Sequence, residues 1–498
     1  MNYIKFISKF LFLMFFIVIG CTDNDDNIGQ NTTAQIRNFV WKGLNTYYLW
    51  KDDVPELNND RFKNQTDLNS FLDGYSSPEI LFQGLLNKPI SKFPKETAID
   101  RFSVIVNDYT FLENLLQGVS KSTGADFNLI KQPSPSNVVY GYITYIIPNS
   151  DAATKTIKRG DIFYAVNGIS LTTENFRSLL GNETYTLNLA NFDNGAITPN
   201  GNSISLTKTE ITENPVFLNR IYEVGTKKVA YLVYNGFTSN FDIELNNAFG
   251  QIKAQGATDL VLDLRYNGGG SIQTAAYLAS MITGQFTGQL FAKEKWNSDI
   301  QSFFENSRPE SLLNLFVNNI IVKDAPAVPI NSLNLTKVYI LTTTATASAS
   351  ELVINSLKPY INVIQIGDIT TGKTAGSITL YDSADFGKSG RSTAHKYAMQ
   401  PLVLKLVNKV GFGEYEAGIK NSDYFVKENL GNLSELGNVN ETYLSIALGA
   451  IQGTNRPKLK TQNINYESVS NSNDLIDFGN EMYLETPKDF NEALKFQK

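Results

Sequence analysis

The chain has 498 residues, 42% of them hydrophobic, and a formal net charge of −6 from 43 basic and 49 acidic side chains. This length allows about three globular domains. The acidic balance, without a long basic run, argues against a nucleic-acid partner. A single cysteine, Cys21, and a single histidine, His395, exclude disulfides within the chain and a zinc site built from several such ligands.

The N-terminus has the pattern of a secretory signal over residues 1–20. Two lysines precede an apolar run, residues 10–19, that ends in Val18-Ile-Gly-Cys21. The run is too short for a membrane span, although an uncleaved anchor is the alternative. The final four residues resemble a bacterial lipobox, which implies that Cys21 is lipidated and begins the mature protein. We therefore expect a lipid-anchored protein of the cell envelope, at the outer membrane and facing the periplasm or the cell surface. Residues 21–32 are polar and are predicted to form a flexible tether.

Two domains are predicted to follow. In residues 33–102, apolar side chains recur at three- and four-residue steps, which predicts a small helical domain. Residues 103–212 alternate short strands and turns, and residues 141–168 resemble the PDZ pattern of a strand, a helix, a Lys/Arg-Gly-Asp turn and a strand ending in Asn-Gly. PDZ domains bind extended peptides by strand addition. The resemblance places the carboxylate-binding loop near Gly124–Phe127, and a β-rich spacer without a ligand is the alternative.

A strand–helix–strand succession begins the next region. Residues 228–233 and 260–264 are predicted strands, and an amphipathic helix over residues 242–254 lies between them, which indicates a parallel pair with a crossover. A loop with three glycines, Arg265–Ser271, then precedes a second helix. Glycines at this place let backbone N–H groups face a ligand or an oxyanion, or simply allow a tight turn.

A serine-rich turn follows the strand predicted over residues 338–341. Only small residues separate this strand from a helix that begins near Ser350. Serine hydroxyls are therefore placed at a helix N-terminus, where negative charge is favoured. This location suits the nucleophile of an acyl-transfer enzyme. However, Ser348 and Glu351 also fit a capping box that only satisfies the first turn.

A third candidate is Lys373, in a glycine-rich loop after an apolar strand that begins at Val363. The letters of residues 367–374 match the spacing of a phosphate-binding loop, yet no apolar helix follows, which disfavours a nucleotide site. Such a lysine can act as a base if it lies against the serine and burial lowers its pKa enough for it to lose its proton near neutral pH.

The three motifs together resemble a known family. Asp263–Gly270, Thr346–Glu351 and Gly367–Lys373 occur in the order and form of the motifs Asp-Leu-Arg-x-Asn-x-Gly-Gly, Ser-Ala-Ser-Ala-Ser-Glu and Gly-x-x-x-x-Gly-Lys. These are the motifs of the C-terminal processing, or tail-specific, serine peptidases. The family's lysine follows its serine by 25 residues, the same spacing that separates Ser348 and Lys373. The resemblance spans residue 35 to about residue 450.

The resemblance implies a role for each motif residue. Ser348 is the expected nucleophile and Lys373 its base, while the N–H groups of Gly269 and Ala349 are expected to form the oxyanion hole. Many members carry a glutamine four residues after the lysine that orients it. Here Ser377 stands at that place and is a possible orienting residue. His395 lies outside the motifs and is expected to be structural.

The predicted fold is a mixed α+β and α/β multidomain protein. It consists of the helical domain, the PDZ-like domain, a crotonase/ClpP-like α/β catalytic core over residues 213–458 and a C-terminal extension over residues 459–498. The predicted function is a lipid-anchored serine endopeptidase without a cofactor, acting on polypeptide substrates that the PDZ-like domain helps to recognise. The alternatives are a non-catalytic peptide- or ligand-binding lipoprotein and a crotonase-like acyl-CoA enzyme. Substrate, cleavage preference and oligomeric state do not follow from the sequence.

Overall fold

The computed structural model describes residues 25–133, 136–193, 195–420, 424–454, 466–476 and 478–485. The predicted signal and Cys21 lie outside these ranges. Helix α1 (Asp25–Tyr47) starts earlier than expected, so residues 25–32 are helical and do not form the predicted tether. Each residue added to an existing helix gains a hydrogen bond, which favours such an extension. Among the described residues, no helix is both long and apolar enough to cross a membrane.

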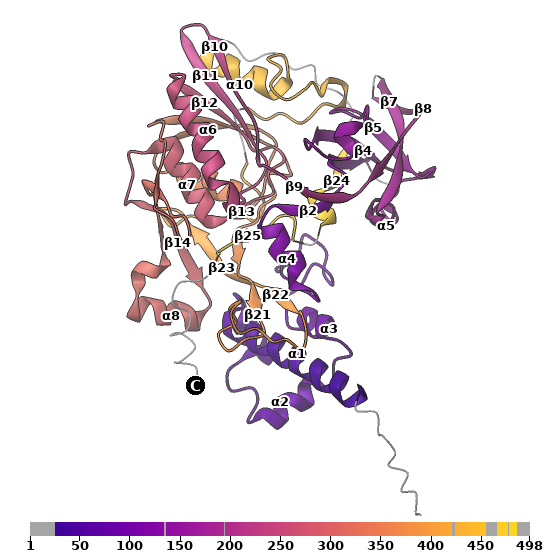
Figure 1. Cartoon of the computed structure of the whole chain (residues 1–498), viewed down its shortest axis with the longest axis vertical. Coiled ribbons are helices and arrows are strands. Elements are labelled where there is room, and N and C mark those ends of the chain that lie inside the picture. The colour runs from indigo at the N-terminus through magenta and orange to yellow at the C-terminus, as the bar shows by residue number, and fades with distance from the viewer. Residues whose placement is uncertain are drawn as a thin grey trace, which may run out of the picture.

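The N-terminal region is helical, as predicted. Helix α1 packs against α2 (Gln65–Leu72) and α3 (Pro78–Gly84), whose N-caps are the side chains of Asn64 and Ser77. The region occupies one end of the molecule (Figure 1). The end of the region folds back onto its helices, because Tyr48 donates a hydrogen bond to the buried Asp100 carboxylate at 2.9 Å.

The middle region is rich in β-strands, and its main sheet has the order β24-β3-β4-β5-β7-β8. Strand β24 comes from the C-terminal part of the chain. The elements of this region are β2 (Val119–Ser122), β3 (Ala125–Lys131), β4 (Val139–Ile146), β5 (Ile162–Val166), β6 (Ile169–Ser170), α5 (Phe176–Gly181), β7 (Thr184–Asp193), β8 (Ala196–Thr207), β9 (Thr209–Thr212) and β24 (Glu467–Asn471).

A central sheet with the order β10-β11-β12-β18-β19 carries the predicted motifs. Its strands are β10 (Val216–Val224), β11 (Lys227–Tyr234), β12 (Asp259–Asp263), β18 (Lys337–Thr342) and β19 (Asn362–Gly367). Strands β11, β12, β18 and β19 are parallel, as the strand–helix–strand pattern predicted. Successive side chains of a strand point to opposite faces. Ala230 and Leu232 therefore join the core under the helices α6 (Asp242–Ala254), α7 (Ile272–Thr283) and α9 (Ala349–Leu357), whereas Tyr231 joins the core beneath α10 (Thr442–Gln452).

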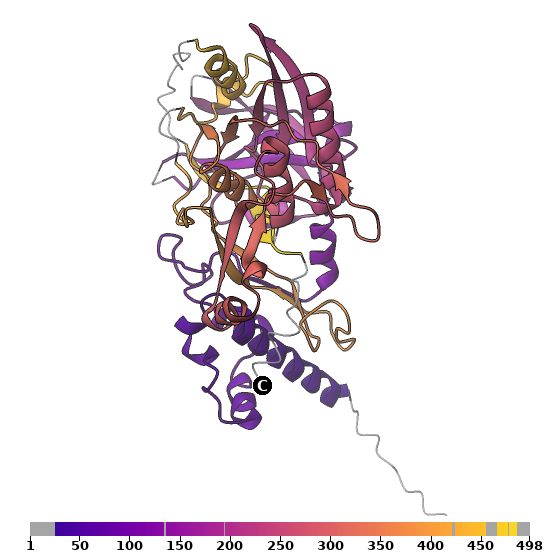
Figure 2. The same ribbon diagram turned by 90° about the vertical axis from the view of Figure 1, so that its left-hand side faces the viewer.

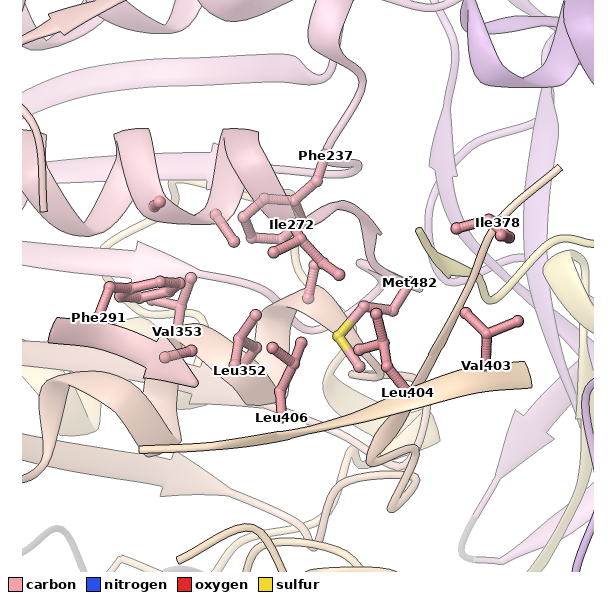
Figure 3. Packing of buried hydrophobic residues seen from close by; sticks show 14 of the residues in the cluster. Phe237, Ile272, Phe291, Leu352, Val353, Ile378, Val403, Leu404, Leu406 and Met482 are labelled. Atoms are coloured by element: carbon pink, nitrogen blue, oxygen red, sulfur yellow. The ribbon is translucent and has the colours of Figure 1, made fainter. Parts of the chain in front are cut away.

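A second sheet packs across the helices and has the order β13-β25-β20-β23-β14-β15. Its strands are β13 (Gly270–Ser271), β25 (Met482–Tyr483), β20 (Ala375–Ser377), β23 (Leu402–Val407), β14 (Leu290–Trp296) and β15 (Leu313–Leu315). Apolar side chains from α7, α9 and β23 meet Met482 of β25 in a buried cluster (Figure 3). Seen from the side, this sheet continues down to the helical region (Figure 2).

Several elements cross the predicted domain boundaries. Strand β1 (Val104–Val106), expected in the middle domain, pairs instead with β22 (Ala398–Gln400), which also pairs with β21 (Leu380–Tyr381). Strands β24 and β25, expected in a separate extension, belong to the middle and second sheets. Strand pairing depends on partners remote in sequence, and so the local pattern could not assign them. The remaining described elements include α4 (Tyr109–Leu116), α8 (Ser298–Ser307), β16 (Asn319–Ile320), β17 (Val328–Pro329) and several short 3-10 turns.

Candidate active site

Ser348 lies where the sequence placed it, at the turn between β18 and α9. Its side chain is fully buried, and its Oγ has no hydrogen-bond partner among the described residues. Its backbone has φ 63° and ψ −116°, a conformation that non-glycine residues rarely adopt and that costs about 1–3 kcal/mol. The preceding turn is held in place because the Ala347 N–H donates to the Asn267 carbonyl at 3.1 Å. A buried hydroxyl at a helix N-terminus, where negative charge is favoured, is compatible with the nucleophile that the sequence predicts.

Glu351 connects the serine and the lysine through their backbones. Its buried carboxylate accepts hydrogen bonds from the N–H groups of Ser348 at 2.8 Å, Gly372 at 2.7 Å and Lys373 at 2.9 Å, and from the Thr370 hydroxyl. The contact with Ser348 is the glutamate half of the capping box that the sequence suggested. Because the same carboxylate also binds the lysine loop, its role exceeds that of a helix cap.

Lys373 is buried, with 1% of its surface exposed, and it lies in the loop just before β20. Burial lowers the pKa of its amine, while the neighbouring Glu481 carboxylate opposes this shift. The amine does not hydrogen-bond to Ser348 here. It donates instead to the Glu481 Oε2 at 2.6 Å and to the Asn480 carbonyl at 3.0 Å.

The predicted oxyanion donors flank the serine. Ala349 is the first residue of α9, and the first N–H groups of a helix lack partners within the helix. Gly269 has φ +111°, and a Cβ added there would lie 2.7 Å from the Ser348 Oγ, so only a glycine leaves room for the hydroxyl at this place. Its own N–H, however, donates to the Asn267 Oδ1 at 2.9 Å in this conformation.

Ser377 lies beside the lysine without touching it. Its hydroxyl donates to the same Glu481 Oε2 at 3.0 Å and accepts a hydrogen bond from the Gln400 amide at 3.1 Å. Gln400 is fully buried on β22. An amide thus enters the site from another strand, whereas the resembled family has its glutamine four residues after the lysine. No sequence motif indicates Gln400, because its spacing from Lys373 belongs to none of the motifs.

Two further parts of the site were missed by sequence reasoning. The end of the helical region reaches the lysine, because the Phe102 ring lies 4.6 Å from the Lys373 amine and Arg101 donates to the Gly372 carbonyl at 2.6 Å. The C-terminal residues Asn480 and Glu481 also touch the lysine, although residues 459–498 carried no recognisable motif. Both contacts are between residues remote in sequence.

The glycine loop is anchored by a buried ion network. Arg265 pairs with Asp263 at 2.7 Å and with Glu441 at 2.8 Å, and all three side chains are almost fully buried. Tyr266, next in the loop, accepts from Arg159 of the predicted Lys/Arg-Gly-Asp turn and contacts Glu428. The Asp-Leu-Arg motif therefore holds the loop through charge pairs, and the middle region contacts that loop directly.

His395 lies away from Ser348 and Lys373. Its Nε2 is 3.0 Å from the Asp382 Oδ2, and its ring packs near Phe39 and Tyr397. These contacts suit the structural role that the sequence predicted.

A substitution of Glu351 tests the connection between the two loops. We expect Glu351→Ala to lower the free energy of unfolding by about 3–5 kcal/mol, because buried N–H groups lose their acceptor. Glu351→Gln should lose less, because an amide oxygen still accepts. Urea titration measures both, with the exposed α8 variant Glu305→Ala as a control that should unfold like the wild type.

The pH dependence of stability provides a second test of Glu351. Burial raises the pKa of its carboxyl from 4.5 to about 7. Between these values the folded protein binds a proton that the unfolded chain releases. This contribution to stability is therefore complete below pH 4.5 and is lost as the pH rises through 7. Urea titrations across this range should show the decline in the wild type and a smaller decline in Glu351→Gln; equal slopes would contradict the assignment.

Two regions of the chain are similar to known protein families. Residues 228–398 match the model of peptidase family S41, and residues 35–104 match the model of the S41 N-terminal domain. A carboxyl-terminal-processing protease of Picosynechococcus sp. is 26% identical over 231 residues, which are 46% of this chain and 49% of that protein. A chloroplastic C-terminal processing peptidase of Tetradesmus obliquus is 26% identical over 277 residues, which are 53% of each chain. The chain thus spans about half the length of the curated relatives it matches.

A solved structure shares the fold. The crystal structure of a candidate S41 protease from Bacteroides fragilis NCTC 9343 superposes with a TM-score of 0.58 at 24% identity, over 83% of this chain and 97% of the other. Together, the matches cover both the helical region and the sheet that carries Ser348. Residues 35–104 and 228–398 are therefore similar to the N-terminal domain and the peptidase domain of family S41, and the chain has a mixed α/β fold.

Proposed function

We propose that this protein is a serine endopeptidase that hydrolyses polypeptides, with Ser348 as nucleophile and Lys373 as general base. The observation that carries the proposal is the buried, unpaired Ser348 hydroxyl at the strained start of α9, joined through Glu351 to the loop of a buried lysine. The match to peptidase family S41 over these same residues supports it.

The chemistry needs an unprotonated amine near the hydroxyl. Burial lowers the pKa of Lys373, which increases the neutral fraction at a given pH. The neutral amine takes the Ser348 proton as the oxygen bonds to the peptide carbonyl carbon. The C–N bond then breaks, the lysine returns the proton to the leaving amine, and an ester remains on Ser348. A water molecule, deprotonated by the same lysine, hydrolyses this ester and restores the serine.

The negative charge on the carbonyl oxygen needs donors. The Ala349 N–H at the start of α9 and the Gly269 N–H are the proposed pair. Since the Gly269 N–H is bound to Asn267 here, its use requires a small rotation of the glycine loop. Such a donor is worth about 3–4 kcal/mol of transition-state stabilisation.

The middle region, the core around Ser348 and the N-terminus each have a proposed role. We propose that the middle region is a PDZ-like peptide-binding domain, since β24 adds as a strand to residues 128–131 of β3. The loop expected at Gly124–Phe127 is mostly the start of β3, which begins at Ala125. Parallel strands that present a glycine loop and a helix N-terminus to one site support a crotonase/ClpP-like core. A lipid anchor at Cys21 would hold the enzyme at the cell envelope, with the membrane and polypeptides as its partners.

Incubation of the full chain with a denatured, alkylated protein tests the peptidase. We expect mass spectrometry to find fragments cut at internal peptide bonds, in the absence of added metal or cofactor. The Met482→Asp variant described below is assayed in parallel. Intact substrate with both proteins at every pH from 6 to 10 would contradict the proposal. Turnover of an acyl-CoA with intact protein substrate would instead favour a crotonase-like enzyme.

A further inference from the structure

The C-terminal part of the chain lies along two edges that bind strands. We call residues 466–476 and 478–485 the tail segment. Its first strand, β24, adds antiparallel to β3, with Glu467 opposite Lys131 and Asn471 opposite Asn128. Beyond it, Arg177 of α5 donates to the Asp474 carbonyl at 2.9 Å. The tail segment therefore follows the edge at which PDZ-like domains bind extended peptides.

The tail segment then enters the second sheet. Strand β25 lies between β13 and β20, and its register places Met482 beside Gly270 and Tyr483 beside Ser271. On its other side, the Leu484 N–H donates to the Ser377 carbonyl at 3.1 Å. Both flanking strands belong to the site, because β13 follows the glycine loop and β20 follows Lys373. An extended backbone is thus bound on both sides, as a peptidase binds its substrate.

The Met482 side chain fills an apolar pocket between these strands. It is fully buried within the cluster that also contains Ile272, Leu352 and Leu404 (Figure 3). The neighbours of Met482 in this cluster are apolar, and the unbranched, flexible methionine side chain fits among them.

The tail segment also reaches the reacting atoms. The Cβ position at Gly269 would lie 2.7 Å from the Ser348 Oγ and 2.8 Å from the Glu481 carbonyl oxygen, so these two oxygens border the same small space. The Lys373 amine is bound by Asn480 and Glu481, both of the tail segment. The neighbouring cavity, about 160 Å³, is bordered by the glycine loop and Glu481, whereas Ser348 lies behind them, fully buried.

We propose that the tail segment is a built-in occupant of the substrate groove: residues 481–484 take the place of an extended polypeptide, and Glu481 holds Lys373 away from Ser348. The tail segment must leave before a substrate is cut. The substrate is then an unfolded polypeptide that adds as a strand between β13 and β20, with a methionine-sized apolar residue directly after the attacked carbonyl. This inference rests on the proposed peptidase function for its consequence, although occupancy of the groove can be measured without activity.

Peptide binding tests the occupancy directly. The probe is a fluorescent peptide with the sequence of residues 478–485, Phe-Gly-Asn-Glu-Met-Tyr-Leu-Glu. Met482→Asp places a charge in the apolar pocket and should release the tail segment. Fluorescence anisotropy should show that the probe binds the full-length Met482→Asp protein at least about 10-fold more tightly than the wild type, because only the variant has an empty groove.

Matched variants make the result specific. Glu485→Gln, an exposed residue at the end of the tail segment, should bind the probe like the wild type. A probe with aspartate in place of its methionine should not bind either protein. Circular dichroism shows whether Met482→Asp is folded. If that variant is unfolded, Glu481→Gln, which removes the charge pair with Lys373, takes its place. Equal probe binding by the wild type and a folded variant, or binding by neither, overturns the proposal.

Cleavage assays separate this inference from the peptidase itself. We expect the tail variant to cut a denatured protein at least about 10-fold faster than the wild type. Equal cleavage by both proteins would overturn the inference and leave the peptidase intact. Selective probe binding without cleavage by any variant would confirm the occupied groove and contradict the peptidase.

Discussion

Replacement of Ser348 by alanine is expected to reduce peptide-bond cleavage at least about 10⁴-fold, because the acyl-enzyme can no longer form. The change removes one buried oxygen that has no hydrogen-bond partner among the described residues, so stability should hardly change. The measurement is the rate of cleavage of a denatured protein, in the wild-type and Met482→Asp backgrounds, together with a thermal melt.

A second serine on the same helix provides the control. The Ser356 Oγ is also buried and unpaired in the part of the chain that the structure describes, but it lies two turns further along α9. Ser356→Ala should therefore cleave at the wild-type rate. If Ser348→Ala kept more than about a tenth of the activity, another nucleophile would be at work.

Loss of Lys373 should have the second-largest effect. A general base contributes about 10²–10⁴-fold to the rate, and Lys373→Met should lower cleavage by about that factor. Methionine preserves most of the apolar volume of the side chain in its buried site. The exposed Lys358, directly after α9, offers Lys358→Met as a control with unchanged activity.

The pH dependence of the cleavage rate tests whether Lys373 acts as a base. Since the neutral amine is the active form, the rate should rise with pH and level off above the pKa of Lys373. Burial places that pKa below the ordinary lysine value of 10.5, and the Glu481 carboxylate raises it in opposition. Glu481→Gln should therefore move the rise in activity to lower pH. A shift to higher pH, or a rate that falls as the pH rises, would contradict the base assignment.

Local sequence patterns predicted much of the catalytic region. Three predicted parts are present in the structure: the strand before Ser348, the helix after it, and the strand–helix–strand unit before the glycine loop. Each has a hydrophobic periodicity that buries one of its faces. The matched spacing of Ser348 and Lys373 identified two residues that the structure joins through Glu351. For Glu351 the sequence indicates only a helix cap, since its second contact, with Gly372 and Lys373, depends on tertiary structure.

Long-range contacts account for what the sequence could not show. Strand β25 spans Met482 and Tyr483 alone, too short a strand to leave a period, yet it closes the substrate groove. Phe102 reaches the lysine, and Gln400 reaches Ser377 beside it, from segments without motifs. These residues belong to the site because the chain folds back to it at these positions. Such long-range contacts depend on tertiary packing, which the spacing of residues in the sequence does not show.

The most direct test of the account is the site of covalent labelling by a fluorophosphonate, a reagent that reacts with activated serines. Peptide mapping of the labelled Met482→Asp protein should locate the adduct on Ser348, and the additional change Lys373→Met should abolish labelling. An adduct on another residue, or labelling of Ser348 that does not depend on Lys373, would contradict the serine–lysine mechanism.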